Sequence, residues 1–323
     1  MNTYLETVKN IYKDAAINPQ KGLCCSTTPV WQFPGLKIPD KMIEMNYGCG
    51  STVHPRDLVN DPSILYVGAG GGMELLQFAY FSRRENAVIG IDPVDVMLEV
   101  CYNNFIEAEK LNTWFKKEFV DLRSGDALSL PVENESIDVA AQNCLFNIFH
   151  DEDLERALKE MYRVLKPHGR LVLSDPVSES PIPENLKNDE RLRALCLSGA
   201  ISLQDYLNRL TAIGFGTIEV RAKRLYRVLD PKHYATDRLI IIESAEICAI
   251  KDPMPEDGPC VFTGRTAIYF GDEEFFNDNK GHILLQNQPL PVCDKTADAL
   301  QKLNRKDIYI SGPTYFYDGG GCC

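Results

Sequence analysis

A glycine cluster that directly follows a short apolar run is the feature that most restricts how this chain can fold. The apolar run Ile64–Val67 precedes Gly68-Ala69-Gly70-Gly71-Gly72, after which Met73–Phe81 shows helical spacing. Glycine lets the backbone pass within contact distance of a ligand, and the start of the following helix offers N–H groups to it. The cluster therefore predicts a strand, a ligand-binding turn and a helix, in that order.

Strand-like and helix-like segments continue to alternate downstream of the cluster. The predicted strands are Ala87–Ile91, Lys117–Asp121, Ile137–Ala141, Arg170–Ser174 and Thr217–Arg221, and the predicted helices are Tyr4–Ala15, Pro93–Ala108, one from Asp151 to near Pro167, about Asn185–Ser198 and Ser202–Gly214. This alternation predicts an α/β fold with a doubly wound, mostly parallel sheet and helices on both faces. In such a fold the ligand lies outside the carboxyl ends of the strands.

The chain has 323 residues, which is the length of about two domains. We expect an N-terminal helix and a proline-rich cover segment over residues 1–62, a ligand-binding core over 63–180, and a segment that completes the fold over 181–249. Residues 250–323 are predicted to form a small C-terminal domain. It contains strand-like runs at Cys260–Phe270 and Asp307–Ser311 and a helix near Lys295–Leu303.

The net charge of −12 disfavours binding to nucleic acid or to an anionic membrane surface, because the chain contains no basic patch to offset it. No apolar run approaches the roughly 18 residues of a membrane span. The polar start of the chain lacks the pattern of a secretory signal. We therefore expect a cytoplasmic protein without a nucleic-acid or membrane partner.

Eleven cysteines are present, and none belongs to a Cys-x-x-Cys pair. In a reducing cytoplasm this pattern disfavours both a disulfide framework and a zinc ribbon. Cys49 with His54 comes nearest to a zinc spacing, but a second pair of ligands is missing. The cysteines are therefore either small buried hydrophobic residues or ligands for a soft atom.

The glycine spacing distinguishes between two kinds of cofactor-binding motif. A dinucleotide fold requires glycine or alanine at position 73, where this chain has Met73. The observed Gly68, Gly70 and Gly72 resemble motif I of S-adenosylmethionine-dependent methyltransferases. That resemblance implies that these three glycines bind S-adenosylmethionine.

Two acidic residues and one loop extend this resemblance. Asp92, at the end of the second strand, stands where that family binds the ribose hydroxyls, and Asp126 stands where it contacts the adenine amino group. The run from Leu165 to Arg170 resembles the loop before the family's fifth strand. Tyr66 is a departure, because the family usually has an acid there to anchor the methionyl amino group.

Three further segments resemble signature segments of the arsenic(III) methyltransferases. They are Tyr47-Gly48-Cys49-Gly50, Asn143-Cys144-Leu145-Phe146-Asn147 and Cys196-Leu197-Ser198-Gly199-Ala200. The end of the chain, with Val261–Arg265 and a closing Gly-Cys-Cys, resembles the branch found in arsenosugar-producing organisms. Trivalent arsenic is soft and prefers thiolate ligands, which agrees with a cysteine in each segment.

The resemblance implies roles for the cysteines. Cys49, Cys144 and Cys196 are the implied arsenic ligands, and Cys24 or Cys25 would form a disulfide with Cys49 that thioredoxin or glutathione reopens. Cys322 and Cys323 end a glycine-rich arm that either delivers arsenic or is a disordered tail. We expect the remaining cysteines to be buried structural thiols: Cys101, Cys248, Cys260 and Cys293.

These features predict an enzyme that transfers a methyl group from S-adenosylmethionine to thiolate-bound arsenite. One alternative keeps the cofactor and methylates a small organic acceptor, which would require a base or an apolar acceptor pocket. Another alternative is a non-enzymatic arsenic-binding protein, which would leave the glycines, Asp92 and Asp126 without a role. Cys144 could also be a core cysteine, although its position borders the predicted cleft.

Overall fold

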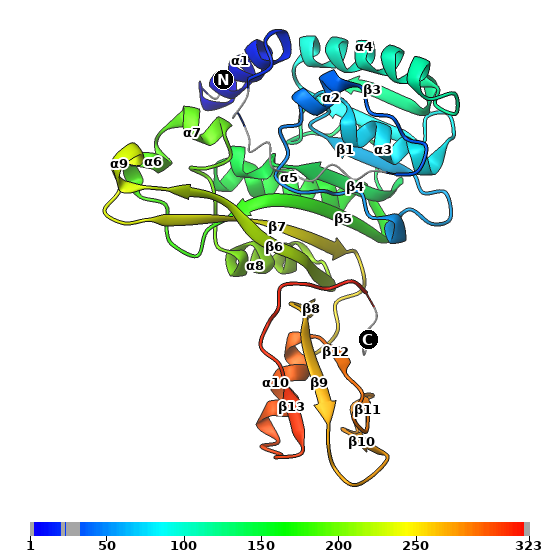
Figure 1. Cartoon of the computed structure of the whole chain (residues 1–323), viewed down its shortest axis with the longest axis vertical. Helices are drawn as coiled ribbons and strands as arrows, with labels where there is room; N and C mark the ends of the chain where they lie inside the picture. The colour runs from blue at the N-terminus through cyan, green and yellow to red at the C-terminus, as the bar shows by residue number, and fades with distance from the viewer. Residues whose placement is uncertain (1–2, 21–22, 24–32, 320–323) are drawn as a thin grey trace.

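The computed structural model describes residues 3–20, 23 and 33–319. Its main sheet contains β1 Ile64–Val67, β2 Val88–Asp92, β3 Val120–Ser124, β4 Ile137–Asn143, β5 Leu165–Val177, β6 Thr217–Leu229, β7 Ile240–Ile250 and β8 Cys260–Phe262. The strand order is β3-β2-β1-β4-β5-β7-β6-β8, and only β7 runs antiparallel to its neighbours (Figure 1). The predicted doubly wound, mostly parallel α/β fold is confirmed.

Helices cover both faces of this sheet. The helices of the described residues are α1 Thr3–Ile17, α2 Asp40–Glu44, α3 Met73–Ser82, α4 Asp95–Leu111, α5 Asp151–Val164, α6 Glu184–Lys187, α7 Glu190–Ala194, α8 Leu203–Ile213, α9 Pro231–Tyr234 and, in the C-terminal lobe, α10 Asp294–Lys302. Short 3-10 turns are η1 Pro55–Asp57, η2 Lys117–Phe119 and η3 Phe146–Ile148. Apolar residues of α5 and α8 pack in one core cluster, and those of α3 and α4 pack in another.

The central strand β1 shows why its sequence is apolar throughout. Leu65 and Val67 pack in the cluster with α5 and α8, whereas Ile64 and Tyr66 pack in the cluster with α3 and α4. All four side chains are buried, because a central strand of a doubly wound sheet has helices on both faces. This burial fixes the carboxyl end of β1, where the glycine turn begins.

Most predicted elements near the glycine turn are confirmed within a few residues, but the start of the strand predicted at Lys117–Asp121 is wrong. Lys117–Phe119 forms a 3-10 turn, and β3 begins only at Val120. The Lys117 N–H donates to the Glu109 side chain and the Glu118 carbonyl accepts from Asn86, so both groups have partners outside a strand. The residue types of this run did not reveal these bonds to residues outside it.

The helix predicted at about Asn185–Ser198 is also wrong, since the structure has the two short helices α6 and α7. The Asp189 carboxylate accepts the N–H groups of Arg191 and Leu192, which starts a new helix. The sequence analysis also missed β7, which inserts antiparallel between β5 and β6. It correctly placed the helix between the Ser202 cap and Gly214.

The C-terminal part contains a smaller lobe, drawn below the main sheet in Figure 1. Its strands are β9 Arg265–Tyr269, β10 Phe275–Asn277, β11 Ile283–Leu285, β12 Leu290–Val292 and β13 Ile308–Ile310. The predicted run Cys260–Phe270 divides at Gly264, which has a φ of 82°. Its first part, β8, pairs with β6 of the main sheet, whereas its second part, β9, lies between β12 and β13.

Candidate active site

The turn after β1 lines a pocket at the carboxyl ends of the parallel strands. Gly68 and Gly70 have φ values of 88° and 52°, in the left-handed region that favours glycine. A Cβ atom added to Gly70 would have one neighbour within 4 Å, the Gly68 carbonyl oxygen at 3.8 Å. The turn is therefore a cradle that a side chain would fill, which fits the close approach of the cofactor implied by the sequence.

Both acidic residues singled out in the sequence line this pocket together with the three glycines. Asp92 accepts the N–H groups of Gly70 at 3.3 Å and Val94 at 3.0 Å. Burial raises the pKa of Asp92 to about 6, although these two donors favour its ionised form. Asp126 accepts the Leu128 N–H at 3.0 Å and lies 3.8 Å from the Lys9 ammonium of α1.

The pocket contains a third carboxylate, Glu74, which the sequence analysis missed. Glu74 is the second residue of α3 and is 5 % exposed. It accepts hydrogen bonds from the Tyr66 hydroxyl at 2.6 Å, the Thr52 N–H at 2.9 Å and the Asn143 amide at 3.1 Å. The available signal was an acidic residue inside the mostly apolar run Met73–Ala79, whose other polar residue is Gln77.

Cys144, directly after β4, lines the pocket, as expected from the proximity of β4 to β1. Its φ is 61°, and that of Cys196, directly after the α7 cap, is 58°. Holding a residue other than glycine in this left-handed region of φ costs a conformational free energy on the order of 1–3 kcal/mol. Backbone bonds hold both turns, since the Cys144 N–H donates to Ser174 at 2.7 Å and the Cys196 N–H to Arg193 at 2.8 Å.

The structure brings Cys49, Cys144 and Cys196 into one buried cluster, although they are far apart in the sequence. The Cys49 sulfur lies 3.5 Å from the Ser174 hydroxyl, and the Cys144 sulfur lies 4.0 Å from the Tyr226 hydroxyl. The Cys196 thiol donates to the Cys144 carbonyl at 2.7 Å. In the described part of the chain, no three His, Cys, Asp or Glu side chains are arranged to hold a metal ion. A ligand bound by all three sulfurs therefore requires these thiols to turn from their present contacts.

Asn143 positions the turn that carries Cys49. Its side-chain oxygen accepts the Cys49 N–H at 2.9 Å, and its side-chain nitrogen donates to the Gly50 carbonyl at 2.8 Å. A Cβ atom at Gly48 would lie 2.5 Å from that nitrogen, so a side chain there would displace the Asn143 amide. The end of β4 thus fixes the Cys49 turn and also carries Cys144.

A buried ionic cluster holds the cover segment against the sheet. Asp57 of η1 accepts hydrogen bonds from Arg221 of β6 at 2.9 Å and from Arg170 of β5 at 2.7 Å. The side chains of Asp57 and Arg221 are 1 % and 3 % exposed. Burial opposes ionisation of Asp57, but the two arginines outweigh it and hold the pKa of this carboxyl below its usual value. The segment after Cys49 is therefore tied to the strands beside the cysteine cluster.

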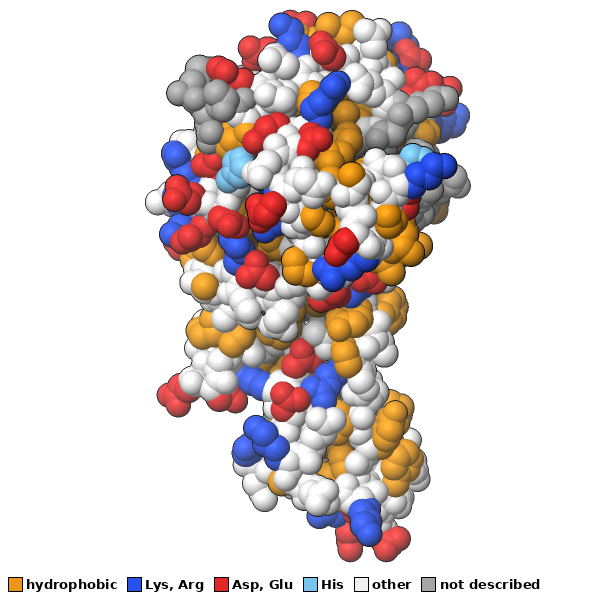
Figure 2. Space-filling model, turned by 90° about the vertical axis from the view of Figure 1, so that its left-hand side faces the viewer, with side chains coloured by type: hydrophobic (Ala, Val, Ile, Leu, Met, Phe, Trp, Pro, Cys, Tyr) orange, Lys and Arg blue, Asp and Glu red, His pale blue; other side chains and the backbone are white. Residues whose placement is uncertain are grey.

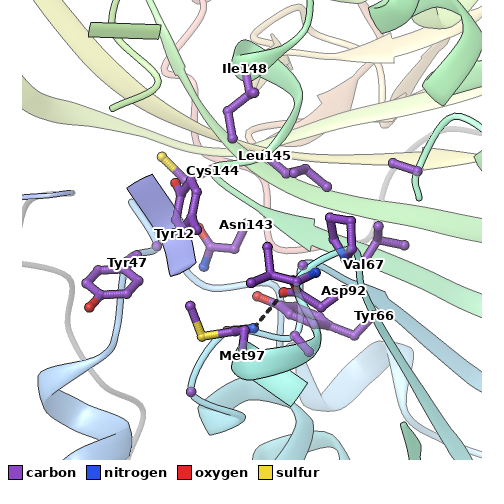
Figure 3. Close-up of a pocket in the computed structure, with 18 of the residues that line it drawn as sticks. Tyr12, Tyr47, Tyr66, Val67, Asp92, Met97, Asn143, Cys144, Leu145 and Ile148 are labelled. Carbon is purple, nitrogen blue, oxygen red and sulfur yellow. Dashed lines mark hydrogen bonds between the residues drawn. The ribbon is translucent and has the colours of Figure 1, made fainter. Parts of the chain in front are cut away.

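Helix α1 closes another side of the pocket through Leu5, Val8, Lys9 and Tyr12. Figure 3 shows Tyr12 and Tyr47 on one side of the view and Asp92 on the other, with Asn143 between them. The pocket wall near Cys144 continues with the apolar residues of the following turn, including Leu145 and Ile148. This wall provides a largely apolar surface beside the glycine cradle.

The remaining cysteines fall into two groups. Cys24, Cys25, Cys322 and Cys323 lie outside the described residues. The cysteines expected to be structural are all buried: Cys101, Cys248, Cys260 and Cys293. Burial raises the pKa of Cys248 to about 12 and that of Cys101 well above its usual value, which suits structural thiols.

Figure 2 shows the distribution of charged side chains on one face of the molecule. On the face drawn in Figure 2, acidic and basic side chains are interspersed, and basic ones do not gather into a patch. Across the described residues, each helix is too short or too polar to cross a membrane. Neither observation offers a binding site for a phosphate backbone on this face.

Comparisons with known proteins show similarity to methyltransferases over the residues that form the pocket. A family model described as a methyltransferase domain matches residues 65–173, which contain the glycine turn and both acids. An arsenite methyltransferase of Aquipseudomonas alcaligenes is 29 % identical over 92 % of this chain and 87 % of its own length. An arsenite methyltransferase of Mus musculus is 31 % identical over 63 % of this chain and 57 % of its own.

A solved structure supports the architecture. The crystal structure of an arsenic(III) S-adenosylmethionine methyltransferase from Chlamydomonas reinhardtii superposes with a TM-score of 0.59 at 21 % identity. The match covers 90 % of this chain and 99 % of that one. At this identity the likeness supports the fold, including the lobes outside the residues that the family model matches.

Proposed function

We propose that this chain, an S-adenosylmethionine-dependent methyltransferase related to the arsenite methyltransferases, transfers a methyl group to trivalent arsenic held by cysteine thiolates. One observation carries the proposal above the others. Cys49, Cys144 and Cys196 come from three distant segments and lie in one buried cluster. Cys144 also lines the pocket of the glycine turn, so acceptor and donor would meet at one place.

The residues of the chain have separable tasks in this reaction. The glycine turn and Asp92 would hold the adenosyl part of the cofactor, and the three thiolates would bind arsenite. When bound, S-adenosylmethionine supplies an electrophilic sulfonium methyl group. The arsenic lone pair forms the As–C bond as the S–C bond breaks, so arsenic passes from the trivalent to the pentavalent state. The apolar wall at Leu145 and Ile148 keeps water away from both reactants.

A trivalent product then requires two electrons. Two protein thiols can supply them by forming a disulfide, with release of two protons. We propose Cys49 and either Cys24 or Cys25 for this step, with thioredoxin or glutathione as the reductant that reopens the bond. The arsenic-delivery role of Cys322 and Cys323 and the arsenosugar branch stay predictions.

The test is to incubate the purified protein with arsenite, S-adenosylmethionine and excess thiol, and to separate the arsenic species by chromatography with elemental detection. We expect methylarsenic from the wild type and a loss of at least about 100-fold in Cys144→Ser and Cys196→Ser, since each removes a ligand of the reacting atom. Cys293→Ala is the matched control, because this buried cysteine packs in a separate cluster with Cys260 and should leave turnover unchanged.

Three outcomes would contradict the proposal. Wild-type protein that binds S-adenosylhomocysteine but forms no methylarsenic would favour an organic acceptor. Arsenite binding without any cofactor binding would favour a sequestering protein. Equal loss of folding in the Cys144, Cys196 and Cys293 variants, seen by circular dichroism, would indicate that the cluster is only core.

A further inference from the structure

The buried carboxylate of Glu74 has a position that its hydrogen bonds alone do not explain. It lies at the start of α3, lines the pocket beside the glycine cradle, and is 5 % exposed. Tyr66 and Asn143, which donate to its Oε2 atom, also line this pocket. Glu74 therefore presents a carboxylate to the ligand from inside the wall.

No basic side chain balances this charge within the described residues. The ion pairs formed there include none with Glu74, and the groups that donate hydrogen bonds to it are a phenol, a backbone amide and a side-chain amide, all neutral. A buried carboxylate is costly unless a cation and hydrogen bonds offset its loss of water. Burial accordingly raises the pKa of Glu74 above its usual value. A cationic group of a ligand would remove this imbalance.

Tyr66 cannot supply the missing anion itself. Burial and the adjacent Glu74 carboxylate raise the pKa of Tyr66 well above its usual value. The phenol stays neutral and donates its proton to Glu74 at 2.6 Å. The negative charge of this part of the pocket therefore lies on Glu74, in the first turn of α3.

The same carboxylate is joined to the turn that carries Cys49. Its Oε1 atom accepts the Thr52 N–H at 2.9 Å, and its Oε2 atom accepts from Asn143. Asn143 in turn binds both the Cys49 N–H and the Gly50 carbonyl. A ligand cation that binds Glu74 would therefore act, through Thr52 and Asn143, on the turn that carries Cys49.

We propose that Glu74 binds the ammonium group of the cofactor's methionyl part and, through Thr52 and Asn143, is a positioning residue for Cys49. This inference rests on the proposed function, but it adds a consequence. Binding of the cofactor and of arsenite are coupled, and the coupling is reciprocal as thermodynamic linkage requires. Glu74 serves both sites at once because it lies between them.

The first test compares two unreactive ligands by calorimetry. S-adenosylhomocysteine retains the ammonium group, whereas 5′-methylthioadenosine lacks the whole amino-acid part. Glu74→Gln should weaken S-adenosylhomocysteine by about 10- to 100-fold, the range for a lost charge-assisted hydrogen bond, and leave methylthioadenosine unchanged. Asp95→Asn is the matched control, because this exposed carboxylate at the start of α4 binds Ser124 and does not line the pocket.

The second test places a carboxylate at position 66 in a variant that lacks the carboxylate of Glu74. In Tyr66→Asp/Glu74→Gln the affinity for S-adenosylhomocysteine should recover, because an acid again faces the same corner. The coupling should not recover. Saturating S-adenosylhomocysteine should change the arsenite affinity of wild-type protein, measured by elemental analysis after equilibrium dialysis, but not that of either variant.

Unchanged S-adenosylhomocysteine binding in Glu74→Gln would overturn the inference, and so would an equal loss for both ligands. If Glu74→Gln does not fold, Glu74→Asp decides the matter, since a smaller but still ligand-selective loss supports the inference and equal losses refute it. The two-ligand comparison contains no arsenic. It can therefore succeed even if the enzyme makes no methylarsenic, which separates this inference from the proposed function.

Discussion

The cofactor pocket and the cysteine cluster lie side by side but are built in different ways. The pocket takes its three glycines, Asp92 and Asp126 from one stretch of chain, between β1 and the residues just after β3. The cluster takes Cys49, Cys144 and Cys196 from a cover segment, a strand end and a helix end. Local backbone geometry produces the first region, and long-range contacts assemble the second.

This difference indicates which changes each region tolerates. The cradle depends on backbone conformation next to a strand that is buried on both faces, so it forms with the sheet itself. The Cys49 turn depends on Asn143 and on the Asp57 cluster, which bridge residues about 90 to 160 positions apart. Damage to a distant anchor should therefore affect the cysteine cluster before it affects the cradle.

The largest expected effect comes from removing the anchor of the cover segment. Asp57→Ala leaves Arg221 buried without its main counter-charge, which should cost about 3–5 kcal/mol in the free energy of unfolding. Urea titration followed by circular dichroism measures this loss. Asp121→Ala is the control, because its pair with Arg123 is about one-third exposed and should contribute less than about 1 kcal/mol.

In the surviving folded fraction of Asp57→Ala, arsenite affinity should fall more than affinity for S-adenosylhomocysteine. Equal losses for both ligands would contradict the proposed separation of the two regions.

The second effect concerns the cradle and its dependence on pH. Asp92→Asn should weaken the binding of 5′-methylthioadenosine by about 10-fold or more, because a carboxylate accepts hydroxyl hydrogen bonds better than an amide does. In wild-type protein the same affinity should decrease as the pH falls through about 6, where Asp92 takes up a proton. Asp92→Asn should lack this decrease. Methylthioadenosine is the suitable probe because it does not reach toward the methionyl corner at Glu74.

The contribution of Asp92 to the stability of the ligand-free protein should depend on pH in the opposite direction to ligand affinity. A carboxyl whose pKa is raised in the folded state contributes stability that is fully present below its unfolded pKa and is lost as the pH rises through about 6. Thermal unfolding of wild type and Asp92→Asn at pH 4 and pH 7 measures it. We expect wild-type protein to lose stability relative to Asp92→Asn between pH 4 and pH 7. A wild type that instead gains stability relative to Asp92→Asn over this range would refute this assignment.

The smallest effect is expected at the contact between α1 and the cradle. Lys9 and Asp126 lie 3.8 Å apart and are 40 % and 34 % exposed, so Lys9→Met should change ligand affinity by only about 2-fold. Binding of S-adenosylhomocysteine at low and high salt measures this change, which should vanish at high salt. A loss above 10-fold would mean that α1 contributes to the pocket through this charge rather than through its apolar residues.

The core of the fold and the cofactor edge could be predicted because their determinants are local. The glycine turn, Asp92 at the end of β2 and the Ser202 cap are each decided by a few adjacent residues, and the structure confirms their positions. The β3 start and the α6–α7 break were predicted wrongly. There the hydrogen bonds of Lys117 to Glu109 and the cap at Asp189 outweigh apolar patterning.

By itself the sequence determined the strand–turn–helix cradle, the three cysteine segments and the absence of a local metal spacing, because these follow from residue type and short-range spacing. Only the tertiary structure decided that the three thiols share one cluster and that Glu74 lines the pocket next to Tyr66. The physical reason is the same in both cases. Distant side chains meet only after the sheet has formed. The pKa of a buried carboxylate and the free-energy cost of its charge then depend on the partners that surround it.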